Sequence, residues 1–276
     1  MIGSVFSPYY AWARARGHDD PEHFCALNVA LYGDCSRWAM TERGRNQIKR
    51  TPDTLTIAAS HLHWEGDTLV IAINETTAPI PRPLRGEVRV HPQMLPGHRE
   101  CLDGQGRHFW WPVAPRARVE VKLTHPQLAW SGVGYHDSNW GDEPLANGFA
   151  DWDWSRAKLR DGSAVVYDVR RRNGEEHTFA LRFDPQGGVE PFALPPRLGL
   201  PKGRWWRVAR SAQSDANTAP QILQTLEDTP FYIRSTLQAQ WLGEPVTAVH
   251  ESLSLDRFTQ PWVQLLLPFR MPRWAR

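Results

Sequence analysis

A short polar segment, GYHDSNWG at residues 134–141, brings together side chains that are able to transfer protons. Residues two apart on a strand project to the same face, so Tyr135 and Asp137 share a face, and His108 and Trp110 form the same kind of pair on a preceding strand. Six of the fourteen tryptophans lie in this part of the chain, at Trp110, Trp111, Trp130, Trp140, Trp152 and Trp154. Indole is the largest apolar side chain and the best cation–π partner, so the region suits an apolar ligand and a cationic intermediate.

The same residues also have ordinary structural interpretations. Asp137 in the DSN triplet is typical of a turn or capping residue, and a lone histidine such as His108 is more often a satisfied polar side chain at a strand end. Clustered tryptophans most often fill a β core, so the candidates for a substrate channel compete with plain packing. These channel candidates are Trp130, Asn139, Trp140, Trp152 and Trp154. Asp151 and Asp153 face away from the last two, and we expect them to be solvated or structural.

The elements that must position these residues are strands. Alternating apolar and polar residues in LTIAASHLHW and TLVIAINET flank an EGD turn and predict a hairpin over 55–76. Two more hairpin turns are predicted at Asp161-Gly162 and Asn173-Gly174, because these dipeptides adopt the primed turns that join antiparallel strands.

Helix signals are few, and we expect short helices only at Thr41–Arg50 and Pro220–Leu226. Many short strands with frequent Gly and Pro turns predict an all-β fold, an antiparallel barrel or sandwich in two lobes. The segment 184–203 is the richest in Pro and Gly. We therefore expect an N-terminal lobe over 1–190, which carries the aromatic and acidic residues, and a smaller C-terminal lobe over 191–276.

Composition excludes several classes of protein. The net charge of +2 provides no field that would attract nucleic acid. Three irregularly spaced cysteines, with no CxxC pair, argue against a disulfide scaffold and a zinc site, and His61 and His63 are more typical of a polar strand face than of a metal pair. The N-terminus has neither a basic leader nor an apolar core segment, so we expect a cytoplasmic protein. The sequence carries no signal for the oligomeric state.

The C-terminal segment 257–276 has two interpretations. It carries four arginines, no acidic residue and many apolar side chains, and it is therefore suited to peripheral contact with an anionic membrane surface. The alternative is that WVQLLLP forms the last core strand and that the arginines belong to a solvated terminus.

Five strings in the chain, in the same order, resemble the carotenoid 1,2-hydratase family: GSVFSPYYAW, NVALYG followed by RWAMTERG, HFWWP, GYHDSNWG and DWDWSRA. They are long and unusual, and they run through most of the chain. The resemblance implies a lipocalin-like, two-lobed β architecture. It also implies hydration of the terminal double bond of an acyclic carotenoid such as neurosporene or lycopene.

The resemblance further implies that a His-x-Trp pair and a Tyr-x-Asp pair are essential, and these fall on His108, Trp110, Tyr135 and Asp137. Hydration of an alkene begins with proton transfer to carbon. We expect Asp137 to donate this proton, because burial among indoles raises the pKa of a carboxyl and keeps it protonated near pH 7. The aromatic faces of Trp110 and Tyr135 would stabilise the tertiary cation by about 2 kcal/mol or more each. Neutral His108 would orient the attacking water and accept its proton.

This scheme involves neither electron transfer nor Lewis acidity, so it implies no cofactor and no metal. The implied partners are the acyclic carotenoid, water and membrane lipid, because such a substrate stays in the bilayer. Two other functions remain open. A lipocalin-like carrier would bind an apolar ligand unchanged, but it has no need for buried polar groups, which cost free energy. An isomerase or cyclase acting on another polyene or terpenoid would share the acid and the aromatics and would exclude water.

Overall fold

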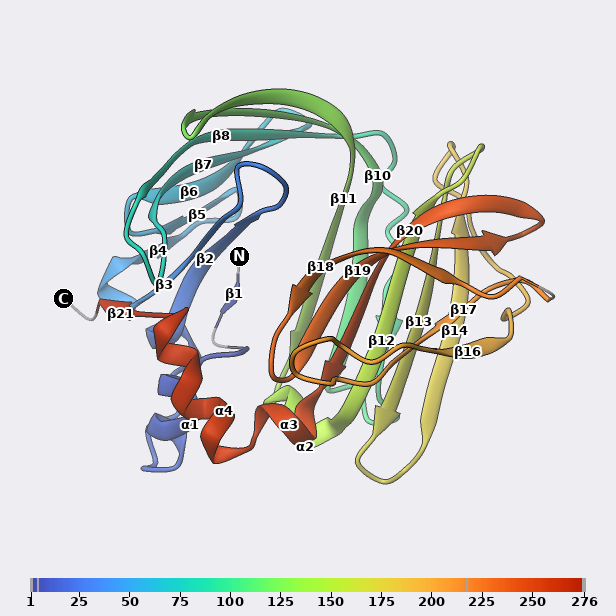
Figure 1. The fold of residues 1–276 in the computed structure, drawn as a ribbon. Helices are drawn as coiled ribbons and strands as arrows, with labels where there is room; N and C mark the ends of the chain where they lie inside the picture. The colour runs from blue at the N-terminus through green and yellow to red at the C-terminus, as the bar shows by residue number, and fades with distance from the viewer. Residues whose placement is uncertain (1, 4, 217, 275–276) are drawn as a thin grey trace. The chain divides into compact units, whose positions relative to one another are not determined.

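The computed structural model describes residues 2–3, 5–216 and 218–274, and antiparallel β-strands dominate it (Figure 1). The prediction of an all-β chain with few short helices is confirmed. Each sheet that the described residues form has two edge strands, so the sheets are open and sandwich-like.

Contacts divide the chain into two compact units, each built from separate segments. Unit 1 comprises Met1–Pro92, Ala117–Gly134 and Gln264–Arg276, and unit 2 comprises Gln93–Arg116 and Tyr135–Val263. The boundary expected near residue 190 does not coincide with this division, because the strands on both sides of it pair within the sheet of unit 2.

Unit 1 contains a small sheet in the order β1-β2-β3-β21 and most of a larger one in the order β11-β10-β8-β7-β6-β5-β4. The strands of the small sheet are β1 (Ile2–Gly3), β2 (Cys25–Leu31), β3 (Arg37–Arg43) and β21 (Arg273–Trp274). Those of the larger sheet are β4 (Ile48–Arg50), β5 (Thr54–Ile57), β6 (Ser60–Glu65), β7 (Thr68–Thr76), β8 (Pro83–Pro92), β10 (His108–His125) and β11 (Gln127–Gly141). The core of unit 1 is aliphatic and includes Leu27, Ala39, Ile73, Leu84, Val121 and Leu123.

The hairpin predicted over 55–76 is confirmed for its turn and its second strand, but its first arm is divided at Ala58, where φ is 53°, into β5 and β6, which pair with each other. Strands β6 and β7 pair antiparallel and meet at a turn in which Gly66 has a φ of 55°. This left-handed conformation is readily adopted by glycine and explains the EGD turn.

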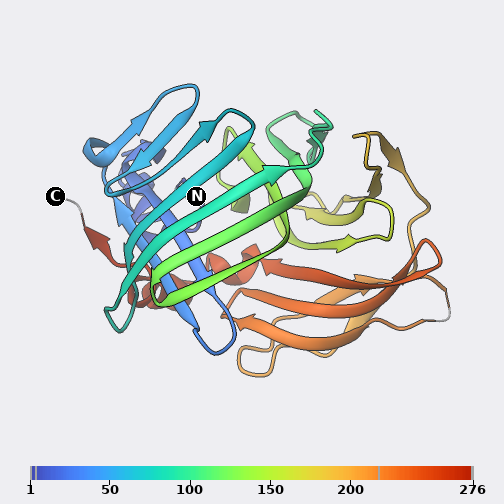
Figure 2. The ribbon, with the colours of Figure 1, turned by 90° about the horizontal axis from the view of Figure 1, so that it is seen from above.

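Unit 2 is built on a seven-stranded sheet in the order β15-β14-β13-β12-β20-β19-β18, and Figure 2 shows β18, β19 and β20 side by side. Its strands are β12 (Phe149–Lys158), β13 (Ser163–Arg171), β14 (Glu176–Phe183), β15 (Val189–Pro191), β18 (Gln221–Asp228), β19 (Tyr232–Trp241) and β20 (Glu244–Ser254). A two-stranded sheet is formed by β16 (Arg197–Leu200) and β17 (Arg210–Gln213), and β9 (Glu100–Cys101) pairs with β10.

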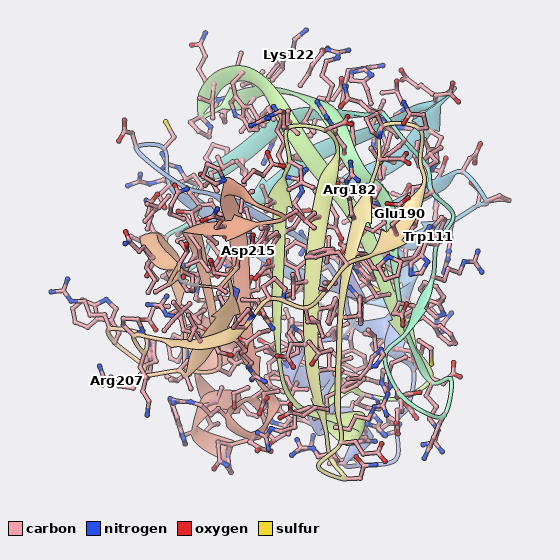
Figure 3. All side chains as sticks on the ribbon, turned by 90° about the vertical axis from the view of Figure 1, so that its right-hand side faces the viewer. Trp111, Lys122, Arg182, Glu190, Arg207 and Asp215 are labelled. Carbon is pink, nitrogen blue, oxygen red and sulfur yellow. The ribbon has the colours of Figure 1, made fainter. Side chains whose placement is uncertain are left out.

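Hairpin turns join the first strands of this sheet, as predicted. Gly162, with a φ of 106°, lies between β12 and β13, and Gly174, with a φ of 88°, lies between β13 and β14. At the edge, Arg182 of β14 lies opposite Glu190 of β15, and the two form an ion pair of 3.8 Å (Figure 3). Strand β13 is buried along most of its length, so it is covered on both faces.

The helices are short. Helix α1 (Pro8–Arg14) begins after Ser7, whose Oγ accepts a hydrogen bond from the backbone N–H of Tyr10 at 3.0 Å. The others are α2 (Leu145–Gly148), α3 (Leu255–Phe258), α4 (Pro261–Leu266) and the 3₁₀ turns η1 (Pro21–Phe24), η2 (Arg45–Gln47) and η3 (Leu267–Phe269). None of the helices formed by the described residues has the length and hydropathy needed to cross a bilayer.

Three local predictions were wrong. The segment Thr41–Arg50 contains the end of β3, the turn η2 and β4, because residues 41–43 pair with β2. The second expected helix, Pro220–Leu226, is instead strand β18, which pairs with β19. Conversely, the WVQLLLP run expected as a core strand forms α4, with Pro261 in the first turn, where a missing N–H costs nothing. Tertiary pairing overrides the weak local preferences in the first two cases.

Candidate active site

Strands β10 and β11 bring three of the predicted site residues together in unit 2. The indole Nε1–H of Trp110 donates a hydrogen bond to Oδ2 of Asp137 at 2.9 Å. The hydroxyl of Tyr135 donates to the same oxygen at 3.0 Å. Tyr135 and Asp137 therefore share a face of β11, as strand alternation predicts.

The carboxyl of Asp137 has the perturbed acidity that the aromatic surroundings predict. Burial raises the pKa of Asp137 to about 6, although the hydrogen bonds from Trp110 and Tyr135 favour the carboxylate, and the charge of Glu251 raises the pKa further. The direction of this shift is the expected one, because it favours the neutral acid, and an apolar substrate that displaced more water would raise the pKa further.

The geometry also indicates which carboxyl oxygen carries the proton. Both donors, Trp110 and Tyr135, reach Oδ2 of Asp137, so the neutral acid places its proton on Oδ1. Tyr135 and Asp137 are each partly exposed, whereas Trp110 is buried. The two donors thus hold one carboxyl oxygen, and the proton of the neutral acid lies on the other.

Aromatic rings surround the acid. The ring of Trp110, which is 0% exposed, lies 5.5 Å from the ring of Tyr167 and 5.7 Å from that of Phe179. The ring of Tyr135 lies 5.3 Å from that of Trp154. Trp152 lies 6.4 Å from Tyr167 and extends the cluster. These centroid distances are those of favourable aromatic pairs, so the rings hold one another in place.

The cluster rests on one row of cross-strand neighbours in the sheet of unit 2. Residues that are directly paired on adjacent strands point to the same face. The row runs across five strands, from β14 to β19, as Phe179, Tyr167, Trp154, Glu251 and Arg234. The first three residues of the row are aromatic. The last two form an ion pair, in which Nη2 of Arg234 lies 2.5 Å from Oε1 of Glu251. Polar groups therefore adjoin the aromatic cluster on one side.

His108 is placed differently from the other three predicted residues. Its Nδ1 lies 2.8 Å from Oδ2 of Asp103, its Nε2 lies 3.3 Å from the carbonyl oxygen of Glu143, and its ring contacts Phe149 at 4.8 Å. Partial burial acts to raise the pKa of Asp103, but hydrogen bonds from His108 and from backbone N–H groups lower it to about 2. Both ring nitrogens of His108 are thus engaged by the protein, which does not favour the expected role of holding a water.

Two glycines make room for the His108 ring. A Cβ on Gly141 would lie 2.6 Å from Cδ2 of His108, and a Cβ on Gly148 would lie 3.0 Å from its Cε1. The last residue of the GYHDSNWG segment is therefore required by close packing against the imidazole. Gly134, the first residue of the segment, lies in unit 1 and is also required by close packing, because a Cβ there would lie 2.2 Å from Cγ2 of Val119.

The expected channel residues divide into two groups. Trp152 and Trp154 belong to the aromatic cluster. Trp140 lies on the other face of β11 from Asp137, is 42% exposed and stacks on Phe109 at 5.3 Å. Asn139 is exposed, and Trp130 belongs to unit 1 and is 50% exposed. The geometry of unit 2 thus supports only the first pair, while Trp111 packs apart from Trp110, under the guanidinium of Arg99.

The structure adds residues that sequence reasoning missed, above all Tyr167, Glu251 and Arg234. A signal for Tyr167 was present, because the turn at Gly162 fixes the pairing of β12 with β13 and so places Tyr167 opposite Trp154. No local signal places β20 beside β12, so Glu251 was not accessible to the same argument.

The opposite face of β12 holds a separate polar cluster. Asp153 accepts hydrogen bonds from the hydroxyls of Ser211 and Ser252, and burial raises its pKa to about 6 against these bonds. His250 lies between Ser155 and Ser252, and burial lowers its pKa to about 4, so its ring is neutral. These groups satisfy one another inside the unit, which agrees with a structural role for Asp153, and Asp151 forms an exposed ion pair with Arg170.

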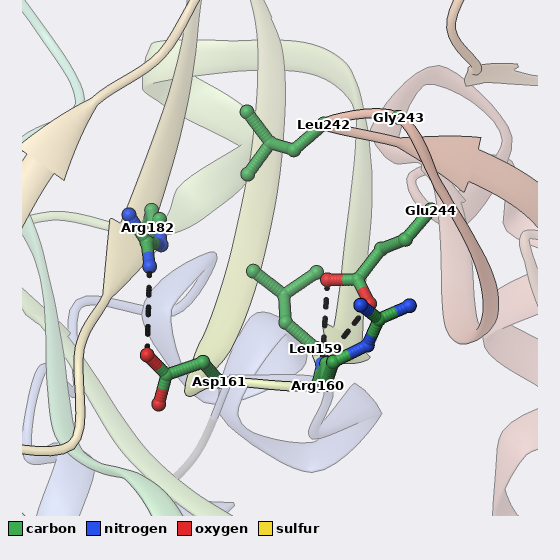
Figure 4. Close-up of a pocket in the computed structure, with 7 residues that line it drawn as sticks. All are labelled: Leu159, Arg160, Asp161, Arg182, Leu242, Gly243 and Glu244. Atoms are coloured by element: carbon green, nitrogen blue, oxygen red, sulfur yellow. Dashed lines mark hydrogen bonds and ion pairs between the residues drawn. The ribbon is translucent and has the colours of Figure 1, made fainter.

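A surface pocket at the far end of β12 is unrelated to the acid. It is lined by Leu159, Arg160, Asp161, Arg182, Leu242, Gly243 and Glu244 (Figure 4). Its charged groups are largely paired, since Asp161 lies 4.0 Å from Arg182 and Glu244 accepts from the backbone N–H of Arg160 at 3.2 Å. None of these residues contributes to the aromatic cluster.

Fold and site together define a class: an all-β enzyme with a carboxyl of raised pKa among aromatic rings. More particularly, the chain belongs to the carotenoid hydratase family, because the model of the family described as carotenoid hydratase CrtC matches residues 1–276. It is 54% identical to the acyclic carotenoid 1,2-hydratase of Thiocapsa roseopersicina over 99% of this chain and 68% of that protein. It is 49% identical to the enzyme of the same name from Rubrivivax gelatinosus over 100% of this chain and 68% of that protein.

A solved structure with a similar fold is that of an AttH protein from Nitrosomonas europaea. The TM-score is 0.53 at 12% sequence identity, and the match covers 84% of this chain and 85% of the other. At this identity, the likeness concerns the fold alone.

Proposed function

We propose that this protein adds water to the terminal double bond of an acyclic carotenoid, such as neurosporene or lycopene, and forms a tertiary 1-hydroxy product. Relatives that match nearly all of this chain carry the name acyclic carotenoid 1,2-hydratase. The observation that carries the proposal is the carboxyl of Asp137, which is partly protonated near neutral pH and is surrounded by aromatic rings.

In the first step, Oδ1–H of Asp137 transfers its proton to the less substituted carbon of the double bond. The bonds from Trp110 and Tyr135 to Oδ2 then stabilise the carboxylate that remains, because charge-assisted hydrogen bonds are stronger than neutral ones. The donors therefore contribute more to the charged product of proton transfer than to the neutral acid, which lowers the barrier.

The tertiary cation forms beside aromatic faces. Each desolvated ring stabilises a cation by about 2 kcal/mol. The partly exposed Tyr135 donates a hydrogen bond to Asp137, and its ring contacts that of the buried Trp154. An aromatic face does not form a covalent bond with the cation as a nucleophilic side chain would. Water then attacks the tertiary carbon and completes the addition without a redox step or a Lewis acid.

Incubation of the protein with lycopene or neurosporene in ¹⁸O-labelled water tests this function. The expected result is the label in a tertiary hydroxyl group. Recovery of unchanged pigment in a bound complex would indicate a carrier, and an unlabelled isomer or ring product would indicate an isomerase or cyclase. Either result would overturn the proposal.

We also propose that the protein takes its substrate from a bilayer through helix α4 and the following turn. Leu265 of α4 and Phe269 of η3 are large apolar side chains that are exposed and close in sequence. Arg273 forms an ion pair with Glu42, so it is less available to anionic lipid than the sequence indicated. The contact would therefore rest mainly on apolar insertion by a protein that remains in the cytoplasm.

A further inference from the structure

Hydration needs a second proton-transfer group. The water that captures the cation loses a proton, and a base that holds this water also directs its attack. His108 was expected to do this, but both of its ring nitrogens already face protein oxygens. The base must therefore be sought among the other polar groups on the face of the sheet that carries the aromatic cluster.

Glu251 is a carboxylate on that face. It lies on β20 directly opposite Trp154 of β12, and cross-strand neighbours of this kind have Cβ atoms about 5 Å apart. The ring of Trp154 contacts Tyr135, whose hydroxyl binds Asp137. Arg234 holds Glu251 through Oε1, while the side chain of Glu251 remains 21% exposed. Glu251 is thus anchored at one oxygen and reachable from outside.

Trp154 provides a second, independent observation. It is 9% exposed, and its indole Nε1 is a buried donor for which the described residues offer no acceptor. Leaving a buried N–H without an acceptor costs about 1 to 3 kcal/mol, so such groups in a native protein usually bind something else. A water molecule that accepts from Nε1 would be bound by the cross-strand neighbour of Glu251.

The field of Glu251 also reaches the acid, since its charge is one of the causes that raise the pKa of Asp137. Two carboxyls with different environments therefore lie close enough to influence each other: Asp137 among rings, and Glu251 against a guanidinium. Such a pair is the arrangement in which one group serves as acid and the other as base.

We propose that Glu251 is the general base of the hydration reaction and that Trp154 holds the attacking water for it through Nε1–H. This inference rests on the function proposed above and deepens it. A water O–H bond breaks as the C–O bond forms, and the proton moves to Glu251. Asp137 has lost one proton and Glu251 has gained one, so exchange with solvent restores both groups and the sum is alkene plus water.

The experiment measures hydration and hydrogen exchange together. Wild type, Glu251→Gln and Asp137→Asn are each incubated with lycopene in D₂O and detergent, and the hydroxylated product and the deuterium in the recovered alkene are quantified. Without its base, the cation forms but is not captured, and it returns to alkene by loss of a neighbouring C–H proton. We therefore expect Glu251→Gln to reduce hydration at least about 100-fold while deuterium still enters the alkene. Asp137→Asn should lose both the hydration activity and the deuterium exchange, because it cannot form the cation.

Two further variants keep the inference falsifiable. Trp154→Phe keeps an aromatic face but removes the N–H, so it should also raise the ratio of exchange to hydration, and it serves if Glu251→Gln does not fold. Asp151→Asn is the matched control, because Asp151 is a partly exposed carboxylate of the same sheet, in an ion pair with Arg170. This control should keep the wild-type ratio.

The inference is overturned if a folded Glu251→Gln protein hydrates at the wild-type rate. It is also overturned if that variant loses exchange and hydration in equal proportion, since this result indicates a merely structural role. A wild-type protein that hydrates no acyclic carotenoid would instead overturn the proposed function, and the inference with it. The two failures are thus distinguishable.

Discussion

At the scale of single residues, the site depends on how differently the protein treats two carboxyls. Burial raises the pKa of Asp137 to about 6, whereas hydrogen bonds to His108 and to the backbone lower that of Asp103 to about 2. The first is kept partly neutral at a free energy cost to folding, and the second is kept charged and stabilises the fold.

Asp137→Asn is expected to abolish turnover and to stabilise the protein. A carboxyl whose folded pKa is raised contributes stability below its unfolded pKa near 4, and this stability is lost as pH rises through about 6. The neutral amide avoids that loss and keeps an acceptor for Trp110 and Tyr135. We expect a gain of about 1 to 3 kcal/mol in the free energy of unfolding at pH 7 and none at pH 3.5. Urea denaturation at both pH values measures it, and a loss of stability at pH 7 would contradict this account.

The pH dependence of catalysis follows from the same group. Because Asp137 must be protonated in order to donate, kcat/KM should fall tenfold per pH unit well above pH 6. A profile from pH 5 to 8.5 on detergent-dispersed substrate measures this. A rate that rises across that range would exclude Asp137 as the proton donor.

Asp103→Asn should act on the fold around His108. Charge-assisted hydrogen bonds contribute about 1.5 to 3 kcal/mol, so the variant should lose free energy of unfolding of that order at pH 7. A carboxyl with a lowered pKa stabilises the fold above its unfolded pKa near 4, and this contribution disappears as pH falls through about 2. The difference between variant and wild type should therefore shrink between pH 4 and pH 2, and a constant difference would refute the assignment.

At the scale of elements, the hairpin between β12 and β13 determines which residues of the aromatic cluster are cross-strand neighbours. Its turn pairs Trp154 with Tyr167, and Gly162 has to be glycine because a Cβ would lie 2.0 Å from the carbonyl oxygen of Phe183. The dipeptides at this turn and the next made both hairpins predictable. The pairing of β12 with β20 was not, because it depends on side-chain packing between segments distant in sequence.

Gly162→Ala should therefore destabilise the protein more than Gly174→Ala. Both glycines have positive φ, which costs a residue with a Cβ about 1 to 2 kcal/mol. Only Gly162 adds a steric clash, since nothing lies within 4 Å of a Cβ on Gly174. Thermal melting of the two variants gives the comparison, and equal losses would show that the turn relaxes.

Individual residues show which parts of the fold and of the site the sequence predicts. Strand alternation predicted that Tyr135 and Asp137 share a face, and the all-β class followed from the same periodicity. The sequence identified His108 as a candidate site residue but did not predict its contacts, because its partner Asp103 comes from a loop with no periodic signal. Helix α4 was missed because a short apolar run such as PWVQLL, of six residues, is compatible with a helix or a strand.

At the scale of the whole molecule, the proposed membrane contact depends on apolar side chains of α4 and η3. Leu265 and Phe269 are 66% and 68% exposed and are close in sequence, so a contact with lipid can be tested by removing both apolar side chains.

The double variant Leu265→Ser/Phe269→Ser should lose activity at least about fivefold on substrate in phosphatidylcholine vesicles, since two apolar side chains contribute a few kcal/mol of insertion. Activity on detergent-dispersed substrate should remain near wild type. Leu223→Ser, an exposed leucine on β18, is the control and should behave as wild type in both assays. Equal losses in vesicles and detergent would indicate a packing role for this face.

The neighbouring positions of β12 and β20 have a consequence for biosynthesis. Trp154 emerges from the ribosome long before Glu251, and the strands between them must be made first. Such late, non-local pairing is slow to form and leaves apolar strands open to aggregation in the meantime. A nascent chain of this protein therefore exposes β12 before its partner strand β20 has been made, and chaperones that shield the unfinished sheet should raise its yield on overexpression.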